Sequence, residues 1–91
     1  MTKRAREILR LMVEKRDHED GELVGDKGQW WIGTERTSFQ VVKQLLTLCL
    51  ISLECGEVGR YEVYQATSEA KKFLANPKYT PLIVRAMRRK R

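Results

Sequence analysis

The sequence predicts a small α+β domain with about three to four helices and a two- or three-stranded antiparallel β-hairpin. Segments 3–16 and 37–50 repeat apolar side chains at the spacing of a helix with one buried side. Segment 51–66 alternates apolar and polar residues around a glycine-containing turn, which is typical of two paired strands. The chain of 91 residues has the length of one domain, so we expect a folded unit over 1–80 and a basic C-terminal helix or tail over 81–91.

The first predicted helix covers about 3–16. Thr2 is placed to cap it, because a threonine hydroxyl accepts a hydrogen bond from a backbone N–H of the first turn. The cluster DHEDG follows, and its Gly21 is a suitable stop. Residues 19–28 are acidic and contain glycines, which predicts a surface loop. The apolar side of this helix comprises Ala5, Ile8, Leu9, Met12 and Val13.

Two structures are open for the segment QWWI, residues 29–32. In the first, a single-turn helix runs over 26–32 and ends at Gly33. In the second, 29–32 is a strand and Thr34 caps one long helix. Two adjacent tryptophans favour a strand, and Gly28 inside a one-turn helix would cost about 1 kcal/mol. We therefore favour the strand.

The second predicted helix, 37–50, has an apolar and a polar side. Its apolar side is centred on Val42, Leu45, Leu46 and Cys49, which predicts a buried thiol at Cys49. The polar side is narrow and nearly uncharged, whereas a merely solvated helix face is often built from Glu and Lys. It comprises Thr37, Gln40, Lys43, Gln44 and Thr47.

A hairpin and further helices are predicted after residue 50. Strands 51–54 and 61–66 would be joined by the turn that holds the glycines. Thr67 is placed to cap a third helix over 68–76, which the Asn-Pro pair ends. A last short helix over 82–91 would be apolar on one side and strongly basic elsewhere, and it could pack against a second copy to form a homodimer.

This order of elements resembles the winged helix-turn-helix superfamily, in particular transcriptional regulators of bacterial or phage type. TERTSFQVVKQLLTLCLISLE looks like the recognition helix of that superfamily and the start of its first wing strand. RYEVYQATSEAKKFL is similar to the second wing strand and following helix of multiple-antibiotic-resistance-type regulators. The likeness covers about half of the chain closely. The chain departs from the pattern before the recognition helix, where GDKGQWWIG stands in place of a full second helix.

The resemblance implies a small regulator that binds double-stranded DNA, with helix 37–50 in the major groove and hairpin 51–66 as the wing. Gln40 and Gln44 lie one helical turn apart, and glutamine bonds bidentately to adenine. Hydroxyls at a helix start can hold a phosphate, and the resemblance implies that Arg60 reaches a minor groove. The candidate DNA-binding residues are Arg36, Thr37, Ser38, Gln40, Lys43, Gln44, Thr47, Arg60, Arg88, Arg89, Lys90 and Arg91.

Charge is unevenly distributed along the chain. Lys and Arg number 18 and Asp and Glu 12, a net charge of +6. Basic residues dominate 1–16 and the tail 85–91, whereas 17–28 is mostly acidic. Basic segments of this kind favour a polyanionic partner, because binding to phosphates releases counterions.

An alternative function is a protein–protein interaction module that reads no DNA sequence. Glu54, Glu57 and Glu62 place negative charge on the hairpin, where it would repel phosphates. Trp30 and Trp31 could then form a docking patch, since exposed aromatics often anchor interfaces. The same two residues would equally serve to close a small core.

Enzymatic and metal-dependent functions find little support. Cys49 and Cys55 have neither disulfide-framework nor zinc-site spacing, and the one histidine, His18, lies in a polar cluster without a neighbouring nucleophile. We expect no cofactor. No segment has the apolar length of a membrane span, and the N-terminus lacks the pattern of a signal peptide. We therefore expect a soluble cytoplasmic protein.

Overall fold

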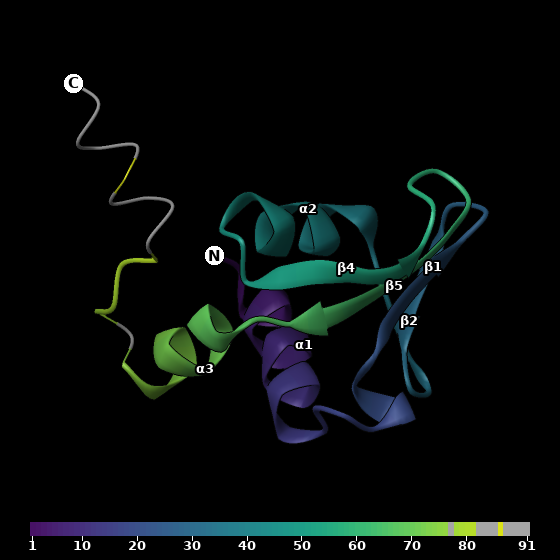
Figure 1. Ribbon diagram of the computed structural model, residues 1–91. Helices are drawn as coiled ribbons and strands as arrows, with labels where there is room; N and C mark the ends of the chain where they lie inside the picture. Colours follow the sequence, from purple (N-terminus) through teal and green to yellow (C-terminus); the bar gives the residue numbers. More distant parts are fainter. Residues whose placement is uncertain (77, 82–85, 87–91) are drawn as a thin grey trace.

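The computed structural model describes residues 1–76, 78–81 and 86 (Figure 1). In this part of the chain the elements are α1 (Lys3–Glu14), the short 3-10 helix η1 (Glu19–Gly21), β1 (Leu23–Asp26), β2 (Gln29–Ile32), β3 (Glu35–Thr37), α2 (Phe39–Thr47), β4 (Ile51–Gly56), β5 (Tyr61–Ala66) and α3 (Ser68–Ala75). The strands form one antiparallel five-stranded sheet in the order β3-β2-β1-β5-β4. The first strand in the chain is therefore the centre of the sheet.

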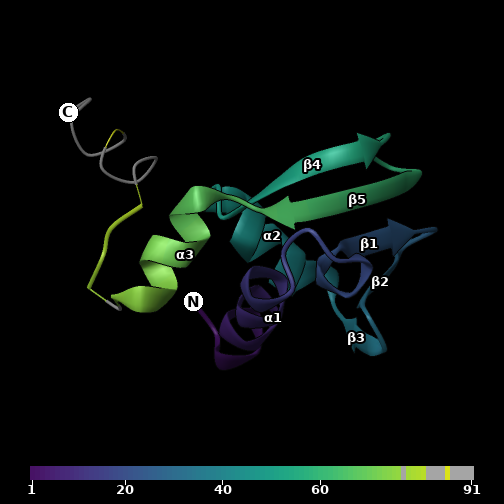
Figure 2. The same ribbon diagram turned by 60° about the horizontal axis from the view of Figure 1, so that its bottom comes forward.

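The helices cover one face of this sheet. Helix α1 contacts α2, α3 and strands β2 and β5, which makes it the central helix of the core (Figure 2). Strand residues alternate between the two faces, and the side chains that face the helices belong to the core, as Leu23 and Tyr64 illustrate. The fully buried side chains include Ile8, Leu9, Met12, Leu23, Ile32, Val42, Leu45 and Leu50.

The prediction of the first helix is confirmed, with an end at Glu14. The Thr2 hydroxyl accepts a hydrogen bond from the backbone N–H of Ala5, as an N-cap does. Ala5, Ile8, Leu9 and Met12 are completely buried, whereas Val13 at the edge is only partly buried.

The predicted winged helix-turn-helix fold is wrong. Residues 23–37 are expected to hold part of a surface loop, then one strand or a single helical turn, and then the start of the second helix. They form three consecutive strands instead. Lys27 and Gly28 both have positive φ, 50° and 81°, which is the backbone of a tight two-residue hairpin turn. This turn folds β2 back onto β1, so strands occupy the place of the second helix of a helix-turn-helix. The result is a strand-rich α+β domain.

The strand interpretation of 29–32 is confirmed, but the expected helix start at Thr34 is wrong. Glu35–Thr37 pairs with β2 as a third strand, and α2 begins at Phe39 with Ser38 as its N-cap. Helix α2 ends at Thr47, earlier than predicted. Cys49 follows it with a φ of 55°, and both cysteines are free and exposed, which corrects the expectation of a buried thiol at Cys49.

The hairpin and the third helix agree with the predictions from sequence. Strands β4 and β5 pair with a register shift between Leu53 and Cys55, so β4 carries an irregularity where Glu54 lies. Helix α3 has Thr67 as its N-cap residue, but the Thr67 hydroxyl does not cap the first turn and instead donates a hydrogen bond of 2.9 Å to the Cys49 carbonyl oxygen. The predicted last helix or tail, 81–91, lies outside the described residues apart from Pro81 and Ala86. No helix of the described residues has the length and apolar character needed to cross a membrane.

Candidate functional site

The exposed side of α2 brings together three of the residues predicted to contact DNA. Gln40, Lys43 and Thr47 are exposed, and Gln44 beside them is half-buried. With Met1 and Leu48 these residues line a shallow hollow of about 470 Å³. The periodicity of the sequence therefore placed Gln40, Lys43 and Thr47 correctly on the exposed side of the helix, whereas Thr37, assigned to the same side, belongs to β3.

The charge on this side of α2 is positive. No acidic residue occurs in the sequence between Glu35 and Glu54, a stretch that includes the whole helix. Among the described residues, Lys43 takes part in none of the observed ion pairs. An exposed lysine without an intramolecular carboxylate partner keeps its charge available to an external anion.

Two of the predicted contact residues have intramolecular hydrogen bonds. The Gln44 Oε1 atom accepts a bond of 3.0 Å from the backbone N–H of Thr2, which fixes the start of α1 against α2. The Thr47 hydroxyl donates a bond of 2.7 Å to the Lys43 carbonyl oxygen, one turn back along the helix. Gln40 and Lys43 therefore remain the side chains of α2 best placed to contact a partner.

The hydroxyls expected at the helix start are not grouped around a phosphate site. Ser38 is the N-cap, and its Oγ accepts a long bond of 3.5 Å from the Val41 N–H. Thr37 belongs to β3 and pairs with Trp30 on the face toward the helices; its buried hydroxyl has no hydrogen-bond partner among the described residues. We had expected both residues at the start of one helix, and the extra strand β3 separates them.

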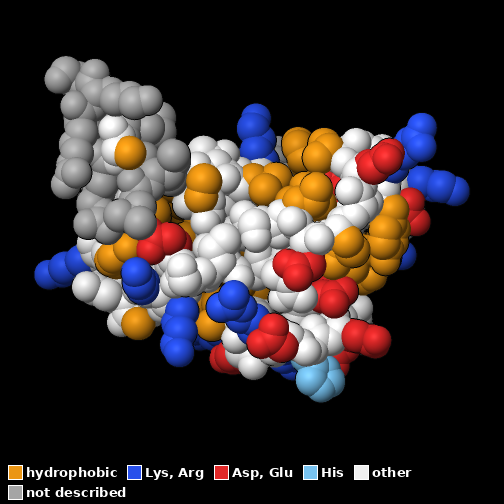
Figure 3. Space-filling view, in the orientation of Figure 1, with side chains coloured by type: hydrophobic (Ala, Val, Ile, Leu, Met, Phe, Trp, Pro, Cys, Tyr) orange, Lys and Arg blue, Asp and Glu red, His pale blue; other side chains and the backbone are white. Residues whose placement is uncertain are grey.

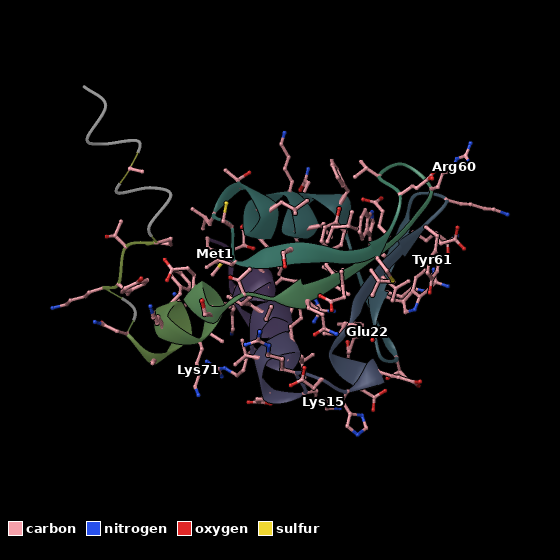
Figure 4. All side chains as sticks on the ribbon, viewed as in Figure 1. Met1, Lys15, Glu22, Arg60, Tyr61 and Lys71 are labelled. Atoms are coloured by element: carbon pink, nitrogen blue, oxygen red, sulfur yellow. The ribbon has the colours of Figure 1, made fainter. Side chains whose placement is uncertain are left out.

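The predicted arginines lie apart from the exposed side of α2. Arg36 pairs with Trp31 on the sheet face away from the helices, and its Nη1 donates to the Gln29 amide oxygen at 3.4 Å. Arg60 lies at the tip of the β4–β5 hairpin, where it points outward (Figure 4) and pairs with Glu57 at 3.7 Å. Arg88, Arg89, Lys90 and Arg91 lie outside the described residues.

A second hollow, which the sequence did not reveal, lies between α2, the β1–β2 turn and the β4–β5 hairpin. This groove has a volume of about 530 Å³. Figure 3 shows hydrophobic side chains gathered around α2 and the hairpin, with charged groups at the hairpin tip. The groove is lined by Asp26, Gly28, Trp30, Phe39, Leu46, Val58, Gly59, Arg60, Glu62 and Tyr64.

Aromatic side chains form much of this groove. Trp30 and Tyr64 are almost completely buried and belong to the core, with ring centroids 6.0 Å apart. Phe39 lies 6.2 Å from Trp30 and is 57% exposed. Of the two alternatives for the tryptophans, Trp30 closes the core, whereas Trp31 is half-buried on the other face of the sheet.

Glu62 places a buried carboxylate in the same groove. Its side chain is only 7% exposed. Oε1 accepts a hydrogen bond of 2.6 Å from the Tyr64 hydroxyl, and Oε2 accepts one of 3.3 Å from the Gly59 N–H. No Lys, Arg or His of the described residues forms an ion pair with it. Its cross-strand neighbours are Gly25 and Gly56. The ring of Trp30 packs against Gly25, and the backbone carbonyl of Tyr61 lies against Gly56.

The burial of Glu62 changes its interpretation from sequence, in which it is one of three hairpin acids whose charge would repel phosphates. Residues two apart in a strand lie on the same face of the sheet, so Glu62 lies on the same face as Tyr64 and Ala66, both of which face the helices. The alternation was visible in the sequence YEVYQA, but Tyr61 and Val63 make the opposite face equally apolar, so the sequence alone did not place the carboxylate inside.

The buried Tyr64 predicts a loss of stability at alkaline pH. Burial raises the pKa of Tyr64 to about 12, and the hydrogen bond to Glu62 and the charge of that carboxylate act in the same direction. An unfolded tyrosine has a pKa of about 10. The stabilisation is therefore complete below about pH 10 and is lost as the pH rises toward 12.

We expect the free energy of unfolding, measured with urea at several pH values, to fall over this range. Tyr64→Phe should show a shallower fall, because lysines and the remaining tyrosines titrate in both proteins. An identical slope in the two proteins would contradict the raised pKa.

The described residues contain no group of three or more His, Cys, Asp or Glu side chains placed to hold a metal ion. Comparison with models of protein families, with curated proteins and with solved structures found no match to this chain.

Proposed function

We propose that this domain binds double-stranded DNA and that the exposed side of α2 is its contact surface. The observation that carries the proposal is the grouping of Gln40, Lys43 and Thr47 on one exposed helix side without a carboxylate. An α-helix fits the major groove, where glutamine can read adenine and lysine can contact guanine or phosphate. The net charge of +6 would add long-range attraction to the polyanion.

The proposal assigns different roles to the side chains of α2. Lys43 contributes charge, and Gln40 supplies an amide able to contact a base edge. Gln44 holds the start of α1 through its bond to Thr2 and so fixes the position of the contact surface. Binding would consequently depend on salt, with a smaller contribution from base sequence.

The variant Lys43→Ala tests this surface. We expect weaker binding to labelled duplex DNA by fluorescence anisotropy at about 50 mM salt, and a slope of log K against log salt that is about 0.9 shallower, as for the loss of one phosphate contact. Lys15→Ala is the matched control, because Lys15 is an exposed lysine at the end of α1 that lies remote from α2 (Figure 4). Equal losses in the two variants, or no binding by the unaltered protein, would refute the proposal.

A second candidate function is a protein-docking module, and the apolar groove is the observation that favours it. Phe39 and Val58 at its edges are 57% and 77% exposed, which is unusual for large apolar side chains. Phe39→Ala separates the two functions. It would impair partner binding at the groove and leave the salt dependence of DNA binding unchanged.

A further inference from the structure

We propose that the groove between α2 and the β4–β5 hairpin is a binding site for an arginine side chain of a partner protein, with Glu62 as its counter-ion. This site is separate from the DNA-contact surface proposed for α2, and neither depends on the other. The combination that points to arginine is a buried carboxylate without a cation, placed among aromatic rings in an open groove.

The first step is the charge of the groove. Among the described residues that line it, Asp26 and Glu62 contribute two carboxylates and Arg60 contributes the one basic side chain. Arg60 points outward from the hairpin tip and pairs with Glu57, and among the described residues it forms no ion pair with Glu62 (Figure 4). The two hydrogen bonds to Glu62 offset part of the cost of burying its charge, and a cation entering the groove would add the missing counter-ion.

The second step is the orientation of the carboxylate. Tyr64 donates to Oε1 and Gly59 donates to Oε2, so both oxygens are held in place. Each carboxylate oxygen can accept more than one hydrogen bond, which leaves capacity on both for a guanidinium group that donates two parallel bonds. The carboxylate is already largely desolvated, so binding requires little further reorganisation.

The third step is the aromatic lining. Phe39 is 57% exposed and offers an aromatic face on which a planar guanidinium can stack. Trp30 and Tyr64 are almost completely buried and contribute the inner wall of the groove. The methylene groups of an arginine side chain would contact Leu46 and Val58 at the edges of the groove. Lysine, a strongly hydrated point charge, would use the rings and the two carboxylate oxygens less fully.

The test is an NMR titration of the full chain with N-acetyl-L-argininamide, monitored at the indole N–H of Trp30. The neutral, nearly isosteric N-acetyl-L-citrullinamide is the control ligand. The signal of Trp30 is assigned by its persistence in Trp31→Phe. We expect a saturable shift with the arginine derivative in the millimolar range, typical of a ligand this small, and at least about tenfold weaker binding of the citrulline derivative.

Variants complete the test. Glu62→Gln keeps the shape of the side chain and should weaken binding of the arginine derivative about tenfold or more. Glu54 is an exposed acid of the same hairpin, and Glu54→Gln should leave the affinity for the arginine derivative unchanged. If Glu62→Gln does not fold, Phe39→Ala replaces it, because Phe39 is 57% exposed and should weaken binding without unfolding the core. No saturable shift up to about 50 mM, equal binding of the two derivatives, or tighter binding of N-acetyl-L-lysinamide would overturn the proposal.

Discussion

Leu45→Ala is expected to lower the free energy of unfolding by about 2–5 kcal/mol. Leu45 is completely buried on the inner side of α2 and belongs to the single cluster that joins the helices to the sheet. The substitution removes apolar contacts and leaves a cavity. The surrounding side chains cannot fill it, because they belong to several elements that would all have to move. Urea denaturation should show a lower midpoint with an unchanged m-value.

Leu53→Ala is the matched control for that prediction. This substitution also replaces a leucine by alanine. Leu53 lies on the helix-facing side of strand β4, but it is 42% exposed. We expect a loss below about 1 kcal/mol. Comparable losses at Leu45 and Leu53 would show that α2 is not packed on the core as described.

Gly56→Ala is expected to destabilise the protein by about 3 kcal/mol or more, because two separate costs combine at this residue. Gly56 has a φ of 96°, a conformation that L residues rarely adopt. In addition, a Cβ atom there would overlap the backbone carbonyl oxygen of Tyr61. That oxygen also accepts the 2.9 Å bond from the Glu57 N–H, so it cannot move without opening the hairpin.

Gly59→Ala separates these two costs. Gly59 has a φ of 89°, but no atom lies within 4 Å of the position its Cβ would take. We expect Gly59→Ala to lower the free energy of unfolding by about 1 kcal/mol, which is the cost of a positive φ for alanine. The two variants are compared by urea denaturation and by hydrogen exchange of the hairpin amides. A loss at Gly56 no larger than that at Gly59 would argue against the close approach of the strands.

The helices and strands predicted from sequence are confirmed where the local residue pattern determines the structure. The helix starting at Lys3, the hairpin strands and the third helix each have a periodic pattern and a suitable cap or turn. The failure with the largest effect on the fold lies in residues 23–37. LVGD is short and follows an acidic stretch, so its local sequence resembles a loop, yet β1 has strand neighbours on both sides. Pairing with β5, far along the chain, is a tertiary effect that local propensity does not contain.

The resemblance to winged helix-turn-helix proteins misled for a related reason. It rested on the segments around α2, the hairpin and α3, which do form a helix, a hairpin and a helix. The departure at GDKGQWWIG was visible in the sequence, and it is there that the structure has strands instead of a helix. A likeness in half of the chain did not determine the architecture of the other half.

The candidate sites were predictable to different degrees. Helical periodicity placed Gln40, Lys43 and Thr47 on one exposed side. The bond between Gln44 and Thr2 joins residues 42 positions apart, which no local pattern reveals. The groove is still harder to predict from sequence, because it forms only when the β1–β2 turn, α2 and the β4–β5 hairpin are placed together in space.

The contact between the start of the chain and α2 has a practical consequence for laboratory work. Thr2 is bonded to Gln44, and Met1 lines the hollow on the exposed side of α2. An affinity tag fused in front of Met1 would therefore emerge beside the surface proposed to contact DNA. An acidic tag there would compete with phosphate for Lys43, and a histidine tag would add cationic groups that attract DNA themselves, so tag-free protein is the appropriate material for every binding measurement.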